Sequence, residues 1–490
     1  MSAASYLGDV QQLVLQASWR RAVHHRVLRF HSREGGIRCL GQLLGQLTFG
    51  PDRQACDKVD CALGLSFRGL EALEVPPAYL GLFRRLAPAF AAGAVPRAAA
   101  RLGDTGPSAA TRWEPAFAHR DAHALVTMHG KPEVLAQAVA ALDRLIASTS
   151  GVESQGKSMA GMHLRAPPGH VDRQNEHWVH FGYRDGLSRP CIEGLLSDDV
   201  AAARAHEIHE PGELLLGEAR DLGDNPWALP SAPQEVRAFF RHGSFAAMRC
   251  IAQDERSFRR ALARWADHIA NDAGRPTDAA WREPLEDFIR AKLCGRWPDG
   301  QPVTPEHLPG ERPPVSATRP PMPDFATQDP DGHGCPFGAH IRRMNPQGHE
   351  VALSVRPRPL FRRGMPYGPW YDAGTEDAPR GLLGLFFCSD IEDQFEHLLG
   401  EWADRMPMGF TGAGDAKDPL IGAHEDPRAT LVVPRPKLAS TPPGAPWTLH
   451  RFEPFVRTLG TLYAFYPSRP ALETIINRTW RREEEPWLVR

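Results

Sequence analysis

The feature that most constrains the fold is a strand-like segment followed directly by an amphipathic helix. Residues 123–130 ("HALVTMHG") alternate enough to predict a strand. Residues 131–148 then have the apolar spacing of a helix that begins near Pro132. One face of this helix carries Leu135, Val139, Leu142 and Ile146. The apolar stripe requires a partner, and the preceding strand belongs to the surface that it would cover.

The same strand-then-helix order returns twice, over residues 243–269 and 381–404, and a final strand is predicted over 460–467. Long irregular connections separate these segments. Between Trp297 and Phe325 the proline density forbids a regular helix and most sheet, which predicts a surface excursion or an extended linker. Interspersed strands and helices of this kind predict an α+β fold with helices packed on antiparallel sheets.

The bulk composition excludes several classes of protein. At 490 residues the chain is expected to form more than one structural unit. A net charge of −2 gives no reason to expect nucleic acid or a membrane surface as the main partner. No apolar run approaches the roughly 20 residues that a membrane helix needs. The N-terminus lacks a basic region followed by an apolar one, so a cytoplasmic location is expected.

Metal-site motifs are weak throughout. The eight cysteines are mostly far apart, and no CxxC pair occurs, so reduced thiols are expected. The histidine groups in 170–180 and 206–210 match neither HExxH nor another strong ligand spacing. Solvated loop or helix faces explain these groups better than a metal site.

Three stretches carry candidate chemistry. In "CPFGAHIRRMNPQ" (335–347), small residues precede His340 and an arginine pair follows it. This arrangement suits a flat, anionic ring beside the histidine, but an isolated histidine is more often an ordinary core or surface residue. In "HFGYRDGLSRPCIEG" (180–194), Asp185 lies among glycines that let the backbone approach a ligand. It is either a turn residue or an acid–base group.

The third stretch, "PLFRRGMPYGPWYD" (359–372), places two arginines before several aromatic residues. One interpretation is a basic surface turn with aromatic packing. The other is an arginine that stabilises developing negative charge, close to oxidisable side chains. Each of the three signals is weak by itself, and only their combination and order favour a function.

Taken in their order along the chain, the three stretches resemble the motifs of the dye-decolorising peroxidases, in particular the longer fungal-like branch with its bacterial relatives. "GYRDG" (182–186) is similar to the family's GxxDG motif, "CPFGAHIRRMNPQ" to its proximal-histidine segment, and "FRRGMPYG" to its distal-arginine segment. Further similar segments, such as "ARLGDTGPS" and "GTLYAFYPS", extend the likeness over nearly the whole chain.

The resemblance implies two ferredoxin-like halves, here 1–205 and 206–490, with one haem b per chain in the C-terminal half. His340 would be the proximal iron ligand, and Asp418 its hydrogen-bond partner, with Glu453 as a weaker rival. Candidate propionate partners are Arg342, Arg343 and the basic segment 356–363. Leu382 and Gly384 would lie over the distal pocket.

The implied reaction uses hydrogen peroxide to oxidise dyes and small phenolic or aromatic reductants through an oxoferryl intermediate. Asp185 would carry the peroxide proton between the two oxygens, while Arg362 would keep it ionised and stabilise the negative charge that develops. Tyr367 and Trp402 match positions implicated in radical transfer to the surface, although simple packing explains both equally well.

Gly384 departs from the family pattern, which has a bulky aromatic residue at this position. We expect its absence to widen the peroxide side of the pocket. Two other functions remain open: a protein that binds haem or handles its iron, with incidental peroxidase activity, and a non-haem metal hydrolase built on the histidine groups. A distal acid–base pair favours the peroxidase, because haem carriage does not need one.

Overall fold

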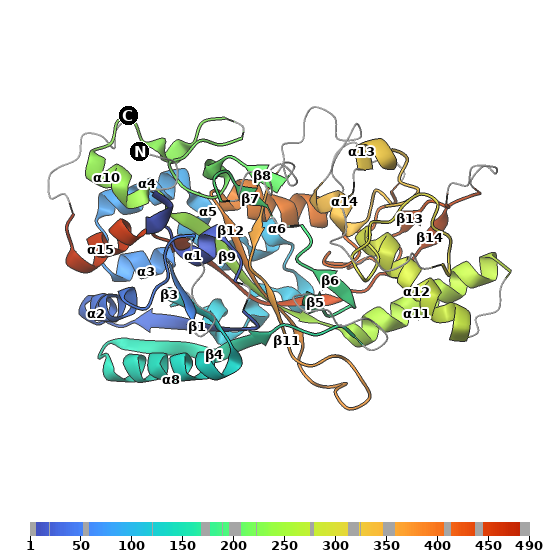
Figure 1. The fold of residues 1–490 in the computed structure, drawn as a ribbon, viewed down its shortest axis with the longest axis horizontal. Helices are drawn as coiled ribbons and strands as arrows, with labels where there is room; N and C mark the ends of the chain where they lie inside the picture. Colours follow the sequence, from blue (N-terminus) through green and yellow to red (C-terminus); the bar gives the residue numbers. More distant parts are fainter. Residues whose placement is uncertain are drawn as a thin grey trace.

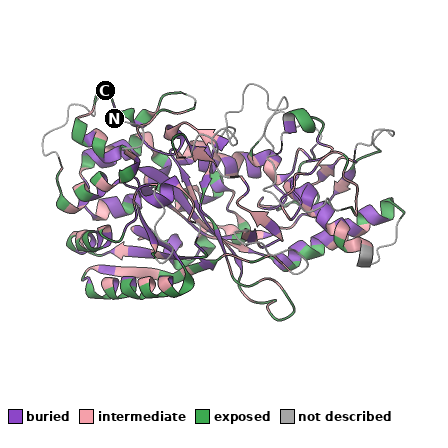
Figure 2. Ribbon diagram, viewed as in Figure 1, coloured by how far each residue is buried: buried purple, intermediate pink, exposed green. Residues whose placement is uncertain are grey.

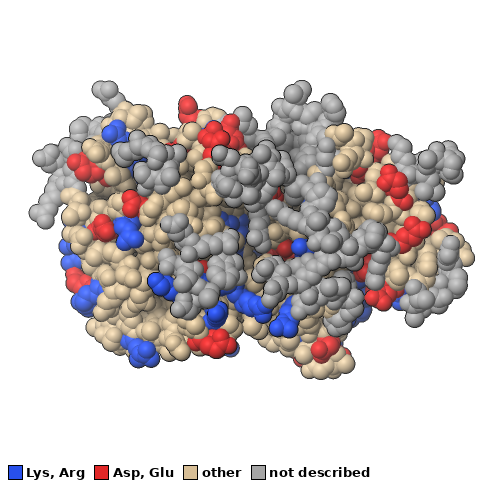
Figure 3. Space-filling view, in the orientation of Figure 1, with Lys and Arg blue, Asp and Glu red and all other residues tan. Residues whose placement is uncertain are grey.

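The computed structural model describes most of the chain (Figure 1). The described residues are 6–18, 20–51, 58–119, 121–167, 177–188, 190–195, 207–221, 223–274, 279–311, 323, 325–345, 358–405, 413–436 and 444–480. Within these ranges, no helix has the length and apolar character needed to cross a bilayer. On the face shown in Figure 3, acidic and basic side chains are interspersed among uncharged ones.

The N-terminal half contains a βαββαβ unit. Its elements are β1 (Ala22–Phe30), α2 (Arg33–Leu44), β2 (Asp60–Leu65), β3 (Ala124–Gly130), α8 (Pro132–Ser148) and β4 (Val152–Met162). The strands lie in the order β2-β3-β1-β4, and all neighbours are antiparallel. This is the ferredoxin-like arrangement. Pro132 occupies the first turn of α8, whose buried residues are Leu135, Leu142 and Ile146.

The C-terminal half repeats this topology. Its elements are β9 (Ser244–Gln253), α11 (Glu255–Asp272), β10 (Phe361–Arg362), β11 (Met365–Tyr367), β12 (Gly381–Cys388), the π-helical turns η9 (Ile391–Glu396) and η10 (Leu398–Ala403), and β15 (Val456–Tyr466). The strand order is β10-β12-β9-β15, again antiparallel. The Asp254 side chain caps α11 by accepting from the Ser257 N–H at 2.9 Å.

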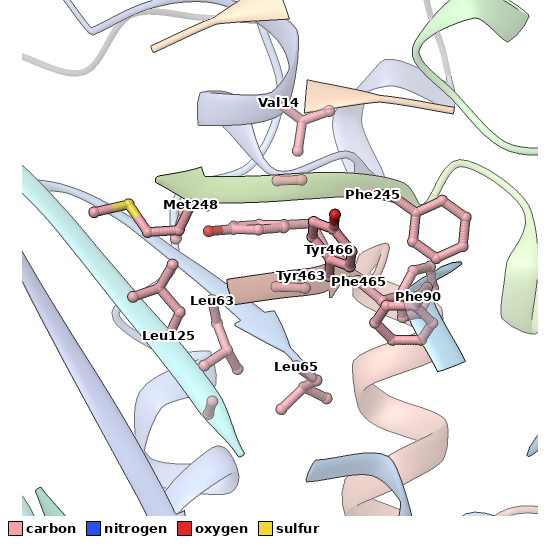
Figure 4. Packing of buried hydrophobic residues seen from close by; sticks show 14 of the residues in the cluster. Val14, Leu63, Leu65, Phe90, Leu125, Phe245, Met248, Tyr463, Phe465 and Tyr466 are labelled. Carbon is pink, nitrogen blue, oxygen red and sulfur yellow. The ribbon is translucent and has the colours of Figure 1, made fainter. Parts of the chain in front are cut away.

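The two halves join into one nine-stranded sheet. At the junction β15 pairs with β2 through a single residue pair, Phe465 with Leu65. Side chains from β2, β3, β9 and β15 pack together there (Figure 4). The two ends of the sheet also meet, since β4, the last strand at one end, lies against β11, which pairs with β12 near the opposite end. A Cβ at Gly161 of β4 would be 2.9 Å from the Pro366 carbonyl oxygen of β11. Figure 2 shows the buried strands running through the middle of the molecule.

A second hydrophobic cluster lies in the lobe on the right of Figure 1, where α11 packs on α12 (Ala279–Cys294) beside β13 (Leu431–Val433) and β14 (Trp447–Leu449). The remaining elements are η1 (Tyr6–Asp9), α1 (Gln12–Leu15), α3 (Phe67–Ala72), α4 (Pro77–Leu86), α5 (Pro88–Ala92), η2 (Val95–Arg97), α6 (Ala98–Leu102), η3 (Gly106–Ser108), η4 (Ala110–Arg112), α7 (Pro115–Ala118), β5 (His177–Val179), β6 (Tyr183–Asp185), β7 (Cys191–Ile192), β8 (Ile208–His209), η6 (Pro211–Glu213), η7 (Pro226–Ala228), α10 (Gln234–Phe240), α13 (Phe325–Gln328), α14 (His340–Met344) and α15 (Arg469–Asn477).

The α+β prediction is confirmed, since helices pack on an antiparallel sheet and each half has the ferredoxin-like strand order. The predicted boundary between residues 205 and 206 falls outside the described residues and stays a prediction. Much of the proline-rich stretch after Trp297 also lies outside them. Residues 297–311 contain no helix, as the proline density predicts, but most of them are buried or half-buried, so this part is not a surface excursion.

Candidate active site

His340 is the first residue of α14, and a carboxylate fixes its ring. The Nδ1 atom lies 2.8 Å from Oδ2 of Asp418, whose side chain is fully buried. The other carboxylate oxygen of Asp418 accepts the backbone N–H groups of Leu420 at 2.9 Å and Ile421 at 3.1 Å. The Asp418 side chain therefore cannot turn without losing three hydrogen bonds.

The charge of Asp418 determines which nitrogen of His340 carries the proton. Burial raises the pKa of the Asp418 carboxyl, but the His340 ring, the Arg343 guanidinium and a backbone donor outweigh it and hold that pKa below its usual range. An ionised carboxylate only accepts hydrogen bonds, so Nδ1 of His340 donates. This leaves Nε2 as the ring nitrogen that can bind a metal ion.

The loop that leads into α14 is fixed by a buried aspartate. Asp329 accepts the N–H groups of Gly334 at 3.0 Å and Cys335 at 2.7 Å. The ammonium of Lys292 donates to the carbonyl oxygens of His333 and Gly334, both at 2.7 Å. These contacts set the path of the backbone just before His340.

Arg342 and Arg343 do not occupy positions suited to propionate groups. Both side chains are fully buried. Arg342 donates to the carboxylate and carbonyl of Asp329 and to the Cys335 carbonyl. Arg343 donates to carbonyl oxygens of Gly338, Trp402, Ala403, Arg405 and Ala416. Their donors hold α14 to its surroundings, so the expectation of propionate pairing is replaced by a structural role.

Asp185 and Arg362 line one cavity that is open to solvent. Asp185 ends β6, and the glycines on either side of the "YRD" strand, Gly182 and Gly186, have φ values of +82° and +73°. Only glycine adopts such angles without strain, so the GxxDG spacing is required by the turn. The exposed guanidinium of Arg362 donates to the Ser188 carbonyl at 3.2 Å.

The same cavity is lined by histidines that the sequence did not single out as a group. They are His129, His163 and His177. The rings of His163 and His177 have centroids 3.7 Å apart, and His177 pairs with Asp185 across β5 and β6. Burial, with His163 nearby, lowers the pKa of His129 to about 3, so that ring is neutral. Among the described residues, no group of three or more His, Cys, Asp or Glu is arranged to hold a metal ion.

Leu382, Gly384 and Phe386 alternate along β12 and therefore point to one face of the sheet. Phe386 pairs directly with Arg362 of β10. A Cβ at Gly384 would lie 2.4 Å from Cε2 and 2.7 Å from Cζ of Phe386. The Phe386 ring thus covers Gly384 and fills the space that a side chain at residue 384 would take. The expectation that this glycine widens the pocket is therefore wrong at this position. An aromatic ring from two residues further along the strand occupies it.

The other predicted residues have varied surroundings. Tyr367 is half-buried in β11, and burial raises the pKa of its phenol. Trp402 in η10 is 4% exposed, and its ring lies 5.4 Å from that of His397. Arg358, from the basic segment, pairs with Asp393 and lies 6.0 Å over the Trp402 ring. Glu453 pairs with Arg264 at 2.9 Å and does not compete with Asp418.

The donor set around His340 fits a haem iron. A neutral imidazole whose second nitrogen donates to a buried carboxylate is the usual arrangement of a metal-bound histidine.

The π-helical segment η9–η10 links this site to the sheet. Arg343 and the Asp418 N–H donate to carbonyl oxygens of η10, while η9 packs on β9 and β12. Short π-helical turns are rare and frequently occur at functional sites.

No family model matches the chain. Curated relatives include a dye-decolorizing peroxidase of Mycetinis scorodonius, 27% identical over 80% of this chain and 72% of that protein. A multifunctional dye peroxidase of Amycolatopsis is 29% identical over 86% of each.

Solved structures agree in fold. A DyP-type peroxidase of Auricularia auricula-judae superposes with a TM-score of 0.75 at 20% identity, covering 98% of this chain and 99% of that one. A dye-decolorizing peroxidase in complex with 2,6-dimethoxyphenol gives 0.74 at 23% identity, with 96% and 99% covered. In both sequence and fold this chain is therefore similar to the dye-decolorizing peroxidases of fungi and bacteria, which are oxidoreductases that use peroxide.

Proposed function

We propose that this protein is a haem peroxidase that uses hydrogen peroxide to oxidise dyes and small phenolic or aromatic donors, with one haem b per chain. The main support for this proposal is that Asp185 and Arg362 line the same solvent-open cavity. A carboxylate and a guanidinium at the same opening supply a base and a fixed positive charge, which peroxide cleavage requires and haem carriage does not.

His340 is proposed to hold the iron through Nε2, with Asp418 keeping the ring in the correct tautomer and orientation. When bound, the haem would supply the redox chemistry with peroxide. The anionic partner makes the imidazole a stronger electron donor, as in other metal sites with a carboxylate behind the histidine. Leu382 is proposed to lie along the cofactor cavity on β12, with the Phe386 ring covering Gly384 beside it.

On the peroxide side, Asp185 is proposed to take the proton from one peroxide oxygen and deliver it to the other, which leaves as water. Arg362 would stabilise the negative charge on the oxygen that has lost its proton. Its backbone anchor at Ser188 belongs to the same turn as Asp185, so the two side chains are positioned by one short segment. Tyr367 and Trp402 are proposed as routes for electrons from donors that cannot enter the cavity.

The deciding experiment is an absorption spectrum of haem-reconstituted protein before and after one equivalent of hydrogen peroxide. We expect a Soret band that changes within the mixing time, and a change at least 100-fold slower in Asp185→Asn or Arg362→Leu, because general acid–base catalysis typically contributes 10²–10⁴-fold. Asp426→Asn and Arg428→Leu alter an exposed aspartate–arginine pair elsewhere and serve as matched controls.

Each remaining outcome identifies a different function. A Soret band that does not respond to peroxide would favour a protein that binds haem or handles its iron. Absence of a Soret band in the wild type, together with unchanged spectra in His340→Ala, would overturn the assignment of His340 and the peroxidase proposal with it.

A further inference from the structure

Tyr463 of β15 is a buried phenol with a carboxylate as its hydrogen-bond partner. Its side chain is 2% exposed, and its hydroxyl donates to Oε1 of Glu396 at 2.9 Å. Burial, together with the neighbouring Glu396, raises the pKa of Tyr463 well above its usual range. The phenol therefore keeps its proton at any ordinary pH, and a base lies in direct contact with that proton.

The cluster of charged side chains around Glu396 has a net negative charge. Arg97 binds both carboxylate oxygens of Glu396 at 2.6 Å and also contacts Glu392. The three groups together carry two negative charges and one positive charge. Protonation of Glu396 would leave Arg97 paired with Glu392, and the cluster would be neutral. The Glu392 side chain is 38% exposed, so the cluster reaches solvent.

Aromatic contacts connect Tyr463 to the sheet face that carries Arg362. The ring of Phe386 lies 5.5 Å from that of Phe395 in η9, and Phe395 lies 6.1 Å from Tyr463. The strand register places the same residues in one row, because Arg362 pairs with Phe386, Phe386 with Ala247, and Ala247 with Tyr463. Phenylalanine is too hard to oxidise to hold a charge itself, but packed rings shorten the path through which an electron tunnels.

We infer that Tyr463 and Glu396 form a proton-coupled one-electron site, in which the tyrosine holds an oxidising equivalent produced by the reaction with peroxide. The inference rests on the proposed function, since the oxidant is the peroxide-oxidised cofactor. It adds an internal site to Tyr367 and Trp402, which were identified by resemblance alone.

The step is balanced as follows. One electron leaves the Tyr463 phenol and reduces the oxidised cofactor by one equivalent. The O–H bond breaks, and the proton moves along the existing hydrogen bond to Oε1 of Glu396. The products are a neutral phenoxyl radical and a neutral Glu396. An electron from an aromatic donor later reduces the radical, and the proton returns from Glu396 to the phenolic oxygen.

Tyr466 provides the matched control. It lies three residues further along β15, so its side chain points to the opposite face of the strand, and it is equally buried at 1% exposed. Its phenol lies beside Thr127 and Cys61 and not beside a carboxylate pair. Among the described residues, Tyr466 has no carboxylate partner that could take its proton, and it is not expected to form the radical.

The test is electron paramagnetic resonance of haem-loaded protein, frozen milliseconds after one equivalent of peroxide. We expect a tyrosyl signal that narrows when the protein contains ring-deuterated tyrosine. Tyr463→Phe should remove most of this signal, and Tyr466→Phe should leave it unchanged. Glu396→Gln keeps an oxygen that accepts the hydrogen bond from the phenol but cannot take its proton. The yield of tyrosyl radical should therefore fall several-fold in this variant.

The result separates this inference from the proposed function. If the Soret band responds to peroxide and the tyrosyl signal survives in Tyr463→Phe, the inference is overturned while the peroxidase stands. If the Soret band does not respond, the proposed function fails first. Circular dichroism and haem content show whether each variant folds, and Tyr463→Phe, which removes a single oxygen, decides the matter if Glu396→Gln does not fold.

Discussion

Gly384 illustrates how a single glycine can be required by a neighbouring ring. Its backbone lies in the middle of β12, where glycine ordinarily weakens a strand. The Phe386 ring lies over it so closely that even a methyl group would meet ring carbons at 2.4 Å and 2.7 Å. The sequence showed the missing aromatic at residue 384, but the compensating ring at 386 becomes visible only when the direction of its side chain is known.

Gly384→Ala should displace the Phe386 ring and lower the free energy of unfolding by about 1–3 kcal/mol, the usual cost of overpacking. Urea denaturation measures this loss. Gly364→Ala is the matched control, since a Cβ there has nothing nearer than 3.7 Å. The double variant Gly384→Ala/Phe386→Leu should lose less free energy of unfolding than the sum of the losses in the two single variants. Equal stability of Gly384→Ala and wild type would show that the ring moves freely.

The loop before α14 owes its shape to side chains rather than to regular hydrogen bonding. Burial raises the pKa of the Asp329 carboxyl, yet two backbone N–H groups and the Arg342 guanidinium converge on it. Arg342 also lies 5.0 Å over the Phe325 ring. The result is a rigid platform from which His340 projects.

Asp329→Asn should free this loop, because it removes the charge opposite a fully buried guanidinium. Breaking a buried pair typically costs about 3–5 kcal/mol. We expect faster hydrogen exchange at Gly334 and Cys335 and weaker retention of haem during gel filtration. Asp377→Asn, at a fully exposed carboxylate, should change neither. Unchanged exchange at Gly334 would mean that Lys292 alone holds the loop.

Elements with strong periodicity were predicted well from the sequence. The helix over 132–148 and the strands within 243–253 and 381–388 form where the apolar pattern places them, whereas the final strand, predicted over 460–467, begins earlier, at Val456. The helical segment after β12 is π-helical, which apolar spacing does not reveal. The roles of Arg342 and Arg343 were mistaken because a sequence gives the charge of an arginine but not the direction of its guanidinium.

Across the whole molecule, buried neutral histidines make stability depend on pH. Burial is the largest cause that lowers the pKa of His24 to about 4, of His129 to about 3 and of His180 to about 4. In the unfolded chain these rings titrate near 6.5. Between pH 6.5 and 4 the unfolded state binds more protons, so stability is lost as the pH falls through this window.

The urea midpoint should therefore fall steadily from pH 7 to pH 4.5, with each such histidine contributing roughly 1.4 kcal/mol per pH unit within its own window. His24→Gln should make the dependence shallower, because it removes one of these groups. His268→Gln, at an exposed position, should leave the slope unchanged. A midpoint that is constant over this range in the wild type would contradict the prediction.

The twofold βαββαβ arrangement could not be read from the amino-acid sequence, in which no internal repeat is visible. Strand order depends on long-range pairing, and the junction of β15 with β2 joins residues about 400 positions apart through one pair, Phe465 with Leu65. Local pattern predicts elements but not such partners. The resemblance to a known family supplied the two halves that the pattern could not.

The place of β15 in the sheet also has a consequence for synthesis. This strand lies between β9 and β2, in the middle of the sheet, yet the ribosome makes it after every other strand. Until it emerges, the edge of β9 that it will cover has no strand partner, and unpaired edges invite association with other chains. A nascent chain that stalls before residue 456 would therefore present an open strand edge, and we expect it to associate with other chains more readily than the complete protein does.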